Sequence, residues 1–140
     1  MSPVIVDTSV LLAFFDASEP DHEAVSDLLA VADVLVVSPY VVAELDYLVA
    51  TRHGVDDELA VLDELAGGAW DLAEFDDEGL RRAREVIASY RDEAIGVADA
   101  SLVVLAERYR TRTIATLDRR HFDVVRSPDG GFFEVLPRVG

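Results

Sequence analysis

Short apolar runs rich in β-branched residues alternate along the chain with longer stretches in which apolar residues recur every three to four positions. The short runs predict buried strands at residues 3–6, 34–37, 70–75, 113–115 and 132–136. The longer stretches predict amphipathic helices at residues 8–15, 21–32, 39–53, 56–66, 77–90 and 97–109. Strands that alternate with helices indicate right-handed crossovers and a parallel sheet covered on both faces. We therefore expect an α/β protein with three α/β/α layers and a central, mainly parallel sheet.

Local signals place the ends of several helices. Ser38 before Pro39 is typical of a helix start, with serine as the N-cap and proline at the first helical position. Gly54 is expected to end that helix, and Gly67 and Gly68 to end the next one. These boundaries support the alternation of helices and strands.

The size and composition of the chain favour a single domain. A chain of 140 residues suits one domain that buries about two-thirds of its unfolded surface. Hydrophobic residues make up 51% of it, too large a share for a disordered chain. The sequence contains no repeats or linker-like tracts, so residues 1–140 are expected to form one domain. A leader-like segment and an apolar run of membrane-spanning length are both missing, which predicts a soluble, cytoplasmic protein.

Charge and residue usage exclude several kinds of chemistry. The chain has no cysteine, and therefore no disulfide or thiolate chemistry. All 12 cationic residues are arginine, which excludes lysine Schiff bases and lysine phosphate sites. Against 28 acidic residues they leave a formal net charge of −16. Such acidity argues against a broad basic nucleic-acid surface. It is compatible with an enzyme that meets phosphate through metal ions and a few arginines, and with a basic protein partner.

Two acidic residues lie where a parallel sheet binds ligands. With 28 acids in 140 residues, one position in five is acidic by chance, so only placement is informative. Asp7 directly follows the first predicted strand, and Asp118 lies just beyond the strand at residues 113–115. Ligands of open parallel sheets bind beyond the carboxyl ends of the strands. Both aspartates are therefore expected at that edge, although each also fits a cap or turn role.

Two further acids occupy helices whose phase suggests that they face inward. Glu44 shares a helix face with Val41, Leu45 and Leu48. Asp99 lies in the first turn of its helix, on a face with Ile95, Leu102, Val103 and Ala106. A carboxylate on an inward face is costly unless it is paired, hydrogen-bonded or bound to metal. A first-turn acid that favours the helix N-terminus is the alternative for Asp99.

Four converging carboxylates without a companion cysteine or histidine suit a hard divalent cation, Mg²⁺ or Mn²⁺. Such an ion can activate water, polarise a phosphoryl group and neutralise a leaving oxygen. The sequence therefore indicates phosphodiester hydrolysis.

Four segments resemble the signature blocks of PIN-domain ribonucleases, and more closely those of the small VapC-type toxins of bacterial toxin–antitoxin pairs. They read VIVDTSVLL, SPYVVAELDYLV, IGVADASLVVLA and TIATLDRRHF. The resemblance extends from about residue 3 to residue 136. Gly96 departs from the pattern, because relatives often carry a hydroxyl residue at that helix start.

The resemblance implies both a site and partners. Asp7, Glu44, Asp99 and Asp118 match the acids that surround one or two Mg²⁺ or Mn²⁺ ions in the family. It implies a type II toxin that cleaves structured cellular RNA and arrests translation. It also implies a cognate VapB-type antitoxin with a basic C-terminal segment across the active site, and a homodimer.

Secondary candidates accompany the four acids. Thr116 matches a hydroxyl position of the family, and Ser9 lies beside Asp7; either side chain could hold a ligand or water, or cap its own loop. Arg119 and Arg120 could bind phosphate with two parallel hydrogen bonds, or be solvated surface charges. The three histidines show no metal-ligand spacing and are interpreted as incidental.

Three other functions compete with this interpretation. A phosphoaspartate enzyme or receiver module also places an aspartate after the first strand, but both depend on a lysine that this chain lacks. A housekeeping PIN-domain nuclease of RNA maturation would share the fold and the acids. A non-catalytic PIN-like binding module would share the fold, but the presence of all four acids argues against it.

Overall fold

A central parallel sheet organises the molecule. The computed structural model describes residues 2–127 and 129–138. Within them, five strands lie in the order β3-β2-β1-β4-β5, with every neighbouring pair parallel. The strands are β1 (Val4–Val6), β2 (Leu35–Val37), β3 (Asp71–Leu72), β4 (Thr113–Ala115) and β5 (Glu134–Leu136). The sheet confirms the predicted architecture and is parallel throughout the described residues.

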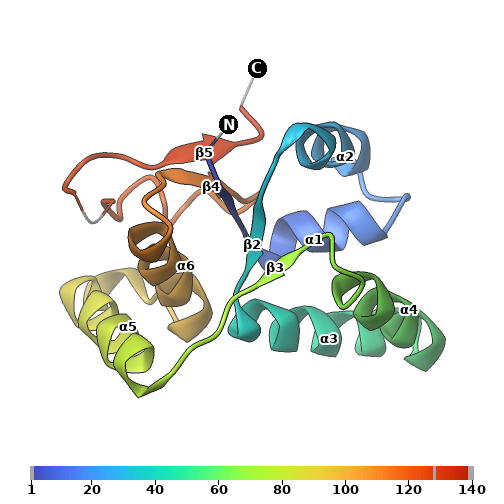
Figure 1. Cartoon of the computed structure of the whole chain (residues 1–140), viewed down its shortest axis with the longest axis horizontal. Helices are drawn as coiled ribbons and strands as arrows, with labels where there is room; N and C mark the ends of the chain where they lie inside the picture. Colours follow the sequence, from blue (N-terminus) through green and yellow to red (C-terminus); the bar gives the residue numbers. More distant parts are fainter. Residues whose placement is uncertain (1, 128, 139–140) are drawn as a thin grey trace.

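Helices cover the sheet on both sides, which confirms the three predicted layers. They are α1 (Thr8–Phe15), α2 (His22–Val31), α3 (Pro39–His53), α4 (Val55–Leu65), α5 (Asp77–Ser89) and α6 (Val97–Arg108), with a short 3₁₀ turn η1 (Arg91–Glu93). Figure 1 shows α1 and α2 on one side of the sheet and α5 and α6 on the other. Among the described helices, none combines the length and the apolarity that crossing a bilayer requires.

The capping signals act as the sequence predicts. The Ser38 side chain accepts a hydrogen bond from the Tyr40 amide, and Pro39 opens α3. Gly54 ends α3 with a positive φ of 93°, which costs glycine little. The Ser38 hydroxyl also lies 2.7 Å from the Ser101 hydroxyl, and both residues are fully buried. This contact ties the start of α3 to α6.

Two predicted strands are shorter than their apolar patterns. Residues 70–75 contribute only Asp71 and Leu72 to the sheet, as an exposed edge strand. Trp70 instead turns toward α4, where its indole N–H donates to Glu64 at 2.8 Å. The last strand begins at Glu134, and Phe133 just before it packs edge-on against Phe122. In both places an aromatic residue packs against a neighbouring segment, and its backbone lies outside the strand.

The core lies between the sheet and the helices. All residues of β1, β2 and β4 are buried, as a sheet covered on both faces requires. The largest fully buried side chains come from both layers of the core: Ile5, Leu11, Leu45, Leu102, Leu105 and Ile114.

The strand order creates one switch point. The chain runs outward from β1 through β2 to β3, then returns to place β4 on the other side of β1. Parallel sheets of this kind bind ligands at the carboxyl ends of the two strands where the order reverses. Here those ends are joined by a hydrogen bond from the Asp7 amide to the Ala115 carbonyl, at 2.9 Å. The residues that follow β1 and β4 therefore face each other.

Candidate functional site

Asp7 is the buried centre of the switch point. It is 7% exposed and is the N-cap of α1, because its Oδ1 accepts a hydrogen bond from the Thr8 amide at 2.8 Å. Its Oδ2 accepts from the Thr116 hydroxyl at 2.7 Å and from the Ser9 hydroxyl at 3.3 Å. The cap role considered from the sequence is therefore confirmed for Oδ1, while Oδ2 is held by two hydroxyl groups.

Ser9 and Thr116 hold the loop after β4 against Asp7. The Ser9 Oγ accepts from the Leu117 amide at 2.9 Å, and the Thr116 Oγ1 accepts from the Asp118 amide at 3.0 Å. Thr116 thus caps its own loop while it donates to Asp7. Both secondary hydroxyl candidates lie at the site, where they orient a carboxylate.

Asp99 approaches the same region from the first turn of α6. The N-cap of α6 is Gly96, which provides no side-chain cap. The Asp99 Oδ2 lies 3.0 Å from the Nδ1 of His121, and about a quarter of each side chain is exposed. The structure therefore brings His121, for which the sequence indicated no role, into contact with Asp99. The sequence places His121 three residues after Asp118, close to a predicted site residue. This spacing does not show that the loop folds back over α6.

Asp118 carries its own counter-ion. Its two carboxylate oxygens accept from Nε and Nη2 of Arg120, at 3.1 and 3.0 Å. Arg119 donates instead to the Pro137 carbonyl at 3.1 Å. The paired donor geometry expected of Arg120 toward phosphate is thus present, but in this structure it is directed at Asp118.

Glu44 departs from its predicted environment. The buried stripe of α3 consists of Val41, Leu45 and Val49, while Glu44 is exposed beside it. The helix is apolar on several sides, so its sequence did not fix which face points inward. Glu44 nevertheless raises the pKa of both Asp7 and Asp99 by repulsion, which places it within electrostatic range of them.

The three aspartates of the site fall into two electrostatic groups. Burial, with added repulsion from neighbouring acids, raises the pKa of Asp7 above its ordinary value of 3.8, although the bonds from Thr116 and Thr8 oppose the shift. Burial likewise raises the pKa of Asp99, against the attraction of His121. The Arg120 hydrogen bonds lower the pKa of Asp118. Charge is therefore least stable on Asp7 and Asp99.

The donor set fits a hard divalent cation. Asp7 and Asp99 offer desolvated carboxylate oxygens that repel each other, and a cation would relieve that repulsion. Glu44 and Asp118 also raise the pKa of Asp99 by repulsion. Within residues 2–127 and 129–138, no three acids or histidines are grouped closely enough to form a ready metal site. Asp7, Asp99 and Asp118 are instead each paired with a neighbouring donor: Thr116, His121 and Arg120 respectively.

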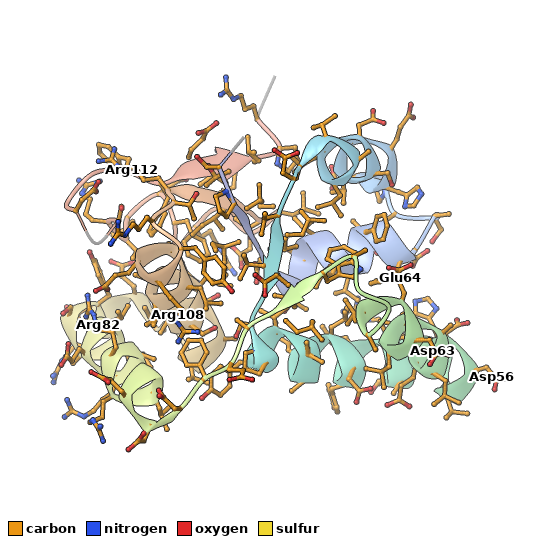
Figure 2. All side chains as sticks on the ribbon, viewed as in Figure 1. Asp56, Asp63, Glu64, Arg82, Arg108 and Arg112 are labelled. Atoms are coloured by element: carbon orange, nitrogen blue, oxygen red, sulfur yellow. The ribbon has the colours of Figure 1, made fainter. Side chains whose placement is uncertain are left out.

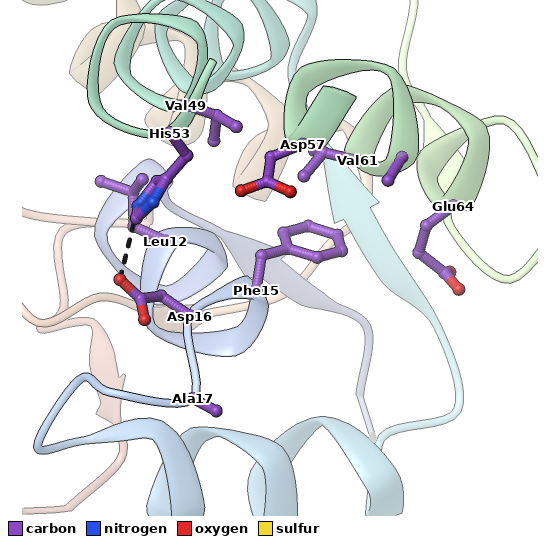
Figure 3. A pocket seen from close by; sticks show the side chains of 10 residues that line it. Leu12, Phe15, Asp16, Ala17, Val49, His53, Asp57, Val61 and Glu64 are labelled. Atoms are coloured by element: carbon purple, nitrogen blue, oxygen red, sulfur yellow. Dashed lines mark ion pairs between the residues drawn. The ribbon is translucent and has the colours of Figure 1, made fainter. Parts of the chain in front are cut away.

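A separate hollow lies at the far ends of α1 and α3. It has a volume of about 370 Å³, and its apolar wall includes Leu12, Phe15, Val49 and Val61. Figure 3 shows carboxylates of Asp16, Asp57 and Glu64 around this wall, with His53 paired to Asp16. The pocket combines an apolar interior with an acidic rim.

The fold and the acids at its switch point define a class of protein. The model of the PIN-domain family matches residues 4–127, and the chain belongs to this family, within which it is a member of the VapC ribonucleases, the toxins of VapBC toxin–antitoxin pairs. It is 64% identical over 135 residues to Ribonuclease VapC26 of Mycobacterium tuberculosis, covering 96% of this chain and 100% of that protein.

Solved structures share the fold at low sequence identity. The VapC20 toxin of Mycobacterium tuberculosis, described as cleaving the sarcin–ricin loop, superposes with a TM-score of 0.78 at 17% identity, covering 89% of this chain and 97% of that one. VapBC2 of Rickettsia felis, bound to a DNA fragment from its promoter, matches with a TM-score of 0.68 at 18% identity, covering 94% and 97%. Both confirm the PIN-like architecture.

The raised pKa of Asp7 predicts that Asp7→Asn stabilises the metal-free protein at neutral pH. A carboxyl whose pKa is raised by folding stabilises the fold while protonated, and this contribution is lost as pH rises through the raised pKa. We expect a melting temperature higher by a few °C, on the order of a 1 kcal/mol gain. The Thr116 hydroxyl can then donate to the Asp118 carbonyl, 3.2 Å away.

Thermal melts in EDTA between pH 4 and pH 8 measure this effect. The advantage should shrink as pH falls toward the ordinary aspartate range. Asp118→Asn is the matched control: the pKa of Asp118 is lowered in the fold, so losing its charge should not stabilise the protein at pH 7. An Asp7→Asn protein that melts below the wild type at pH 7 would contradict the prediction.

Proposed function

We propose that this VapC-family protein is an endoribonuclease that depends on Mg²⁺ or Mn²⁺ and acts on structured cellular RNA to arrest translation. The observation that carries the proposal is the buried Asp7 carboxylate at the switch point, desolvated and repelled by Asp99 and Glu44. A bound ion would activate water and neutralise charge on the scissile phosphate. Asp7 and Asp99 would be its main ligands, with Glu44 and Asp118 beside them as further ligands for one or two ions.

Neighbouring side chains prepare the acids for this task. Thr116 and Ser9 fix the direction of the Asp7 carboxylate, and His121 fixes that of Asp99. Arg120 has its guanidinium plane against Asp118 at the exposed rim. It can exchange that carboxylate for a phosphate of the substrate, because the two groups accept the same pair of hydrogen bonds.

Cleavage of a stem-loop RNA with the sequence of the sarcin–ricin loop tests the activity. Asp7→Asn should lower the rate by at least about a hundredfold, since the ion supplies several kcal/mol of transition-state stabilisation and each 1.4 kcal/mol is a factor of ten. EDTA should have the same effect, reversed by Mg²⁺ or Mn²⁺. Asp63→Asn, on the exposed face of α4, is the control.

Two results would overturn the proposal. Cleavage that persists in EDTA in a contaminant-free Asp7→Asn preparation would exclude the metal mechanism. A wild-type protein that binds RNA but cleaves none with either ion would indicate a non-catalytic PIN-like binding module.

His121 is proposed as a positioning residue for the metal ligand Asp99. Asparagine at this position places an amide N–H near the site of Nδ1, whereas glutamine places it near Nε2. We therefore expect His121→Asn to keep most of the Mn²⁺ affinity, and His121→Gln and His121→Ala to lose roughly ten- to a hundredfold, as for other residues that orient metal ligands. Titration calorimetry with Mn²⁺ and no RNA measures it. Wild-type affinity in His121→Ala would show that the contact with Asp99 is incidental to metal binding.

The partner proposed for the toxin is a VapB-type antitoxin with a basic C-terminal segment. Its apolar side chains would fill the pocket of Leu12, Phe15 and Val49, and its cations would meet the acidic rim. An arginine of the same segment would reach the acids at the switch point and take the place of a metal ion's charge. The net charge of −16 should speed its association.

Calorimetry across a salt series, with the product of the adjacent gene, tests this partner. Affinity should fall as salt rises, and Asp57→Asn at the pocket rim should lower it further; replacing the arginines of the segment by alanine should remove most of it. Binding that is insensitive to salt and to those arginines would rule out this mode of inhibition. Two related proposals are tested on the toxin alone. A single transition in a thermal melt is expected if residues 1–140 unfold as one domain, and sedimentation at the mass of two chains is expected if the toxin is a homodimer.

A further inference from the structure

The charges of this chain are strongly segregated. Eleven of the 12 arginines lie in residues 81–138, together with nine of the 28 acids, whereas residues 1–80 hold 19 acids and one arginine. Figure 2 shows the result: Arg82, Arg108 and Arg112 lie on the side of α5, α6 and β4, and Asp56 and Asp63 lie across the molecule on α4. The formal charge is thus 11 − 9 = +2 for residues 81–138 and 1 − 19 = −18 for residues 1–80, so a polyanion is repelled far less by the arginine-bearing side.

An exposed arginine and an exposed phenylalanine are stacked on the arginine-bearing side. The guanidinium carbon of Arg126 is 3.8 Å from the centroid of the Phe132 ring. Phe132 is 62% exposed and Arg126 is also exposed. Among the described residues, no carboxylate pairs with the Arg126 guanidinium, so its charge is available to a ligand.

The backbone around the pair is held in place on both sides. The Arg126 amide donates to the Tyr90 hydroxyl at 3.0 Å, at the end of α5. The Ser127 amide donates to the Gly131 carbonyl at 2.8 Å, which closes the turn between the two side chains. The pair is thus a preformed surface, with its planar groups stacked before any ligand arrives.

The pair is connected directly to the candidate active site. Phe133, next to Phe132, packs against Phe122, next to His121, with ring centroids 6.0 Å apart. The Val125 amide donates to the His121 carbonyl at 2.8 Å. His121 and Arg126 are five positions apart in the chain, so their Cα atoms are at most about 18 Å apart. This upper limit corresponds to roughly five nucleotide steps at 3.4 Å each.

We propose that Arg126 and Phe132 form a stacking platform for an unpaired base of the RNA substrate, a second contact beside the carboxylate site. Proteins recognise unpaired bases by stacking them on aromatic rings and guanidinium planes. The charge of Arg126 suits a phosphate beside that base, whereas Arg82 and Arg112 are already paired with Glu107 and Asp129. A protein partner would gain little from so small a pair of side chains. The platform depends on the ribonuclease function proposed above.

Binding, separated from cleavage, tests the platform. The measurement is fluorescence anisotropy of the stem-loop RNA with full-length Asp7→Asn protein in EDTA. Phe132→Ala should weaken binding roughly five- to a hundredfold, the range for one stacked base, and Phe132→Trp should retain or improve it. Arg126→Gln should weaken binding and reduce the salt dependence by about one phosphate contact. In the metal-loaded wild-type background, the same changes should raise KM more than they lower kcat.

Matched controls separate the platform from general effects. Leu59→Ala removes an equally exposed apolar side chain on α4, and Arg52→Gln removes the arginine of the acidic side; neither should change RNA affinity. Wild-type affinity in both Phe132→Ala and Arg126→Gln would overturn the inference, as would equal losses in the controls. If the Phe132→Ala protein does not fold, the RNA affinities of Arg126→Gln and Phe132→Trp still test the platform. RNA binding that is unchanged while the oligomeric state shifts would assign the pair to a protein interface. Failure of the nuclease proposal is seen separately, as cleavage that survives Asp7→Asn.

Discussion

The hydrogen bond from Thr116 to the buried Asp7 carboxylate is the contact on which the site depends. It joins the residues that follow β1 and β4, the two strands between which the sheet order reverses. A carboxylate buried this deeply is tolerated only because hydroxyl and amide donors surround it. The same burial leaves its charge poorly compensated. The hydrogen bonds to Asp7 are thus sufficient to hold its carboxylate in one orientation. They are not sufficient to compensate its negative charge.

Much of this arrangement could be predicted from the sequence because local signals and burial coincide. The boundaries of α1 and α3 follow from capping residues and apolar periodicity, and Asp7 and Asp118 follow from their positions after strands. Glu44 was misplaced because α3 is apolar on several sides. His121 was missed because its contact with Asp99 is made by a loop that has no periodicity, and only the tertiary structure brings the two together.

The distribution of charge divides the molecule between two kinds of ligand. The side formed by α4 and the ends of α1 and α3 is acidic around an apolar hollow, whereas the side of α5, α6 and the β4–β5 connection carries nearly all the arginines. The candidate acids lie between these sides, at the carboxyl edge of the sheet. A net charge of −16 therefore describes neither surface. Local sign, and not the total, decides what each side attracts.

The buried contact between Ser38 and Ser101 fixes one end of α3. The contact holds the first turn of α3 to α6, the helix of Asp99. From there α3 runs 15 residues, about 22 Å, to His53 at the acidic pocket. Glu44 lies close to the fixed end, whereas Val49 and His53 lie farther along the helix. A tilt of α3 about this contact would therefore displace Glu44 less than it displaces Val49 or His53.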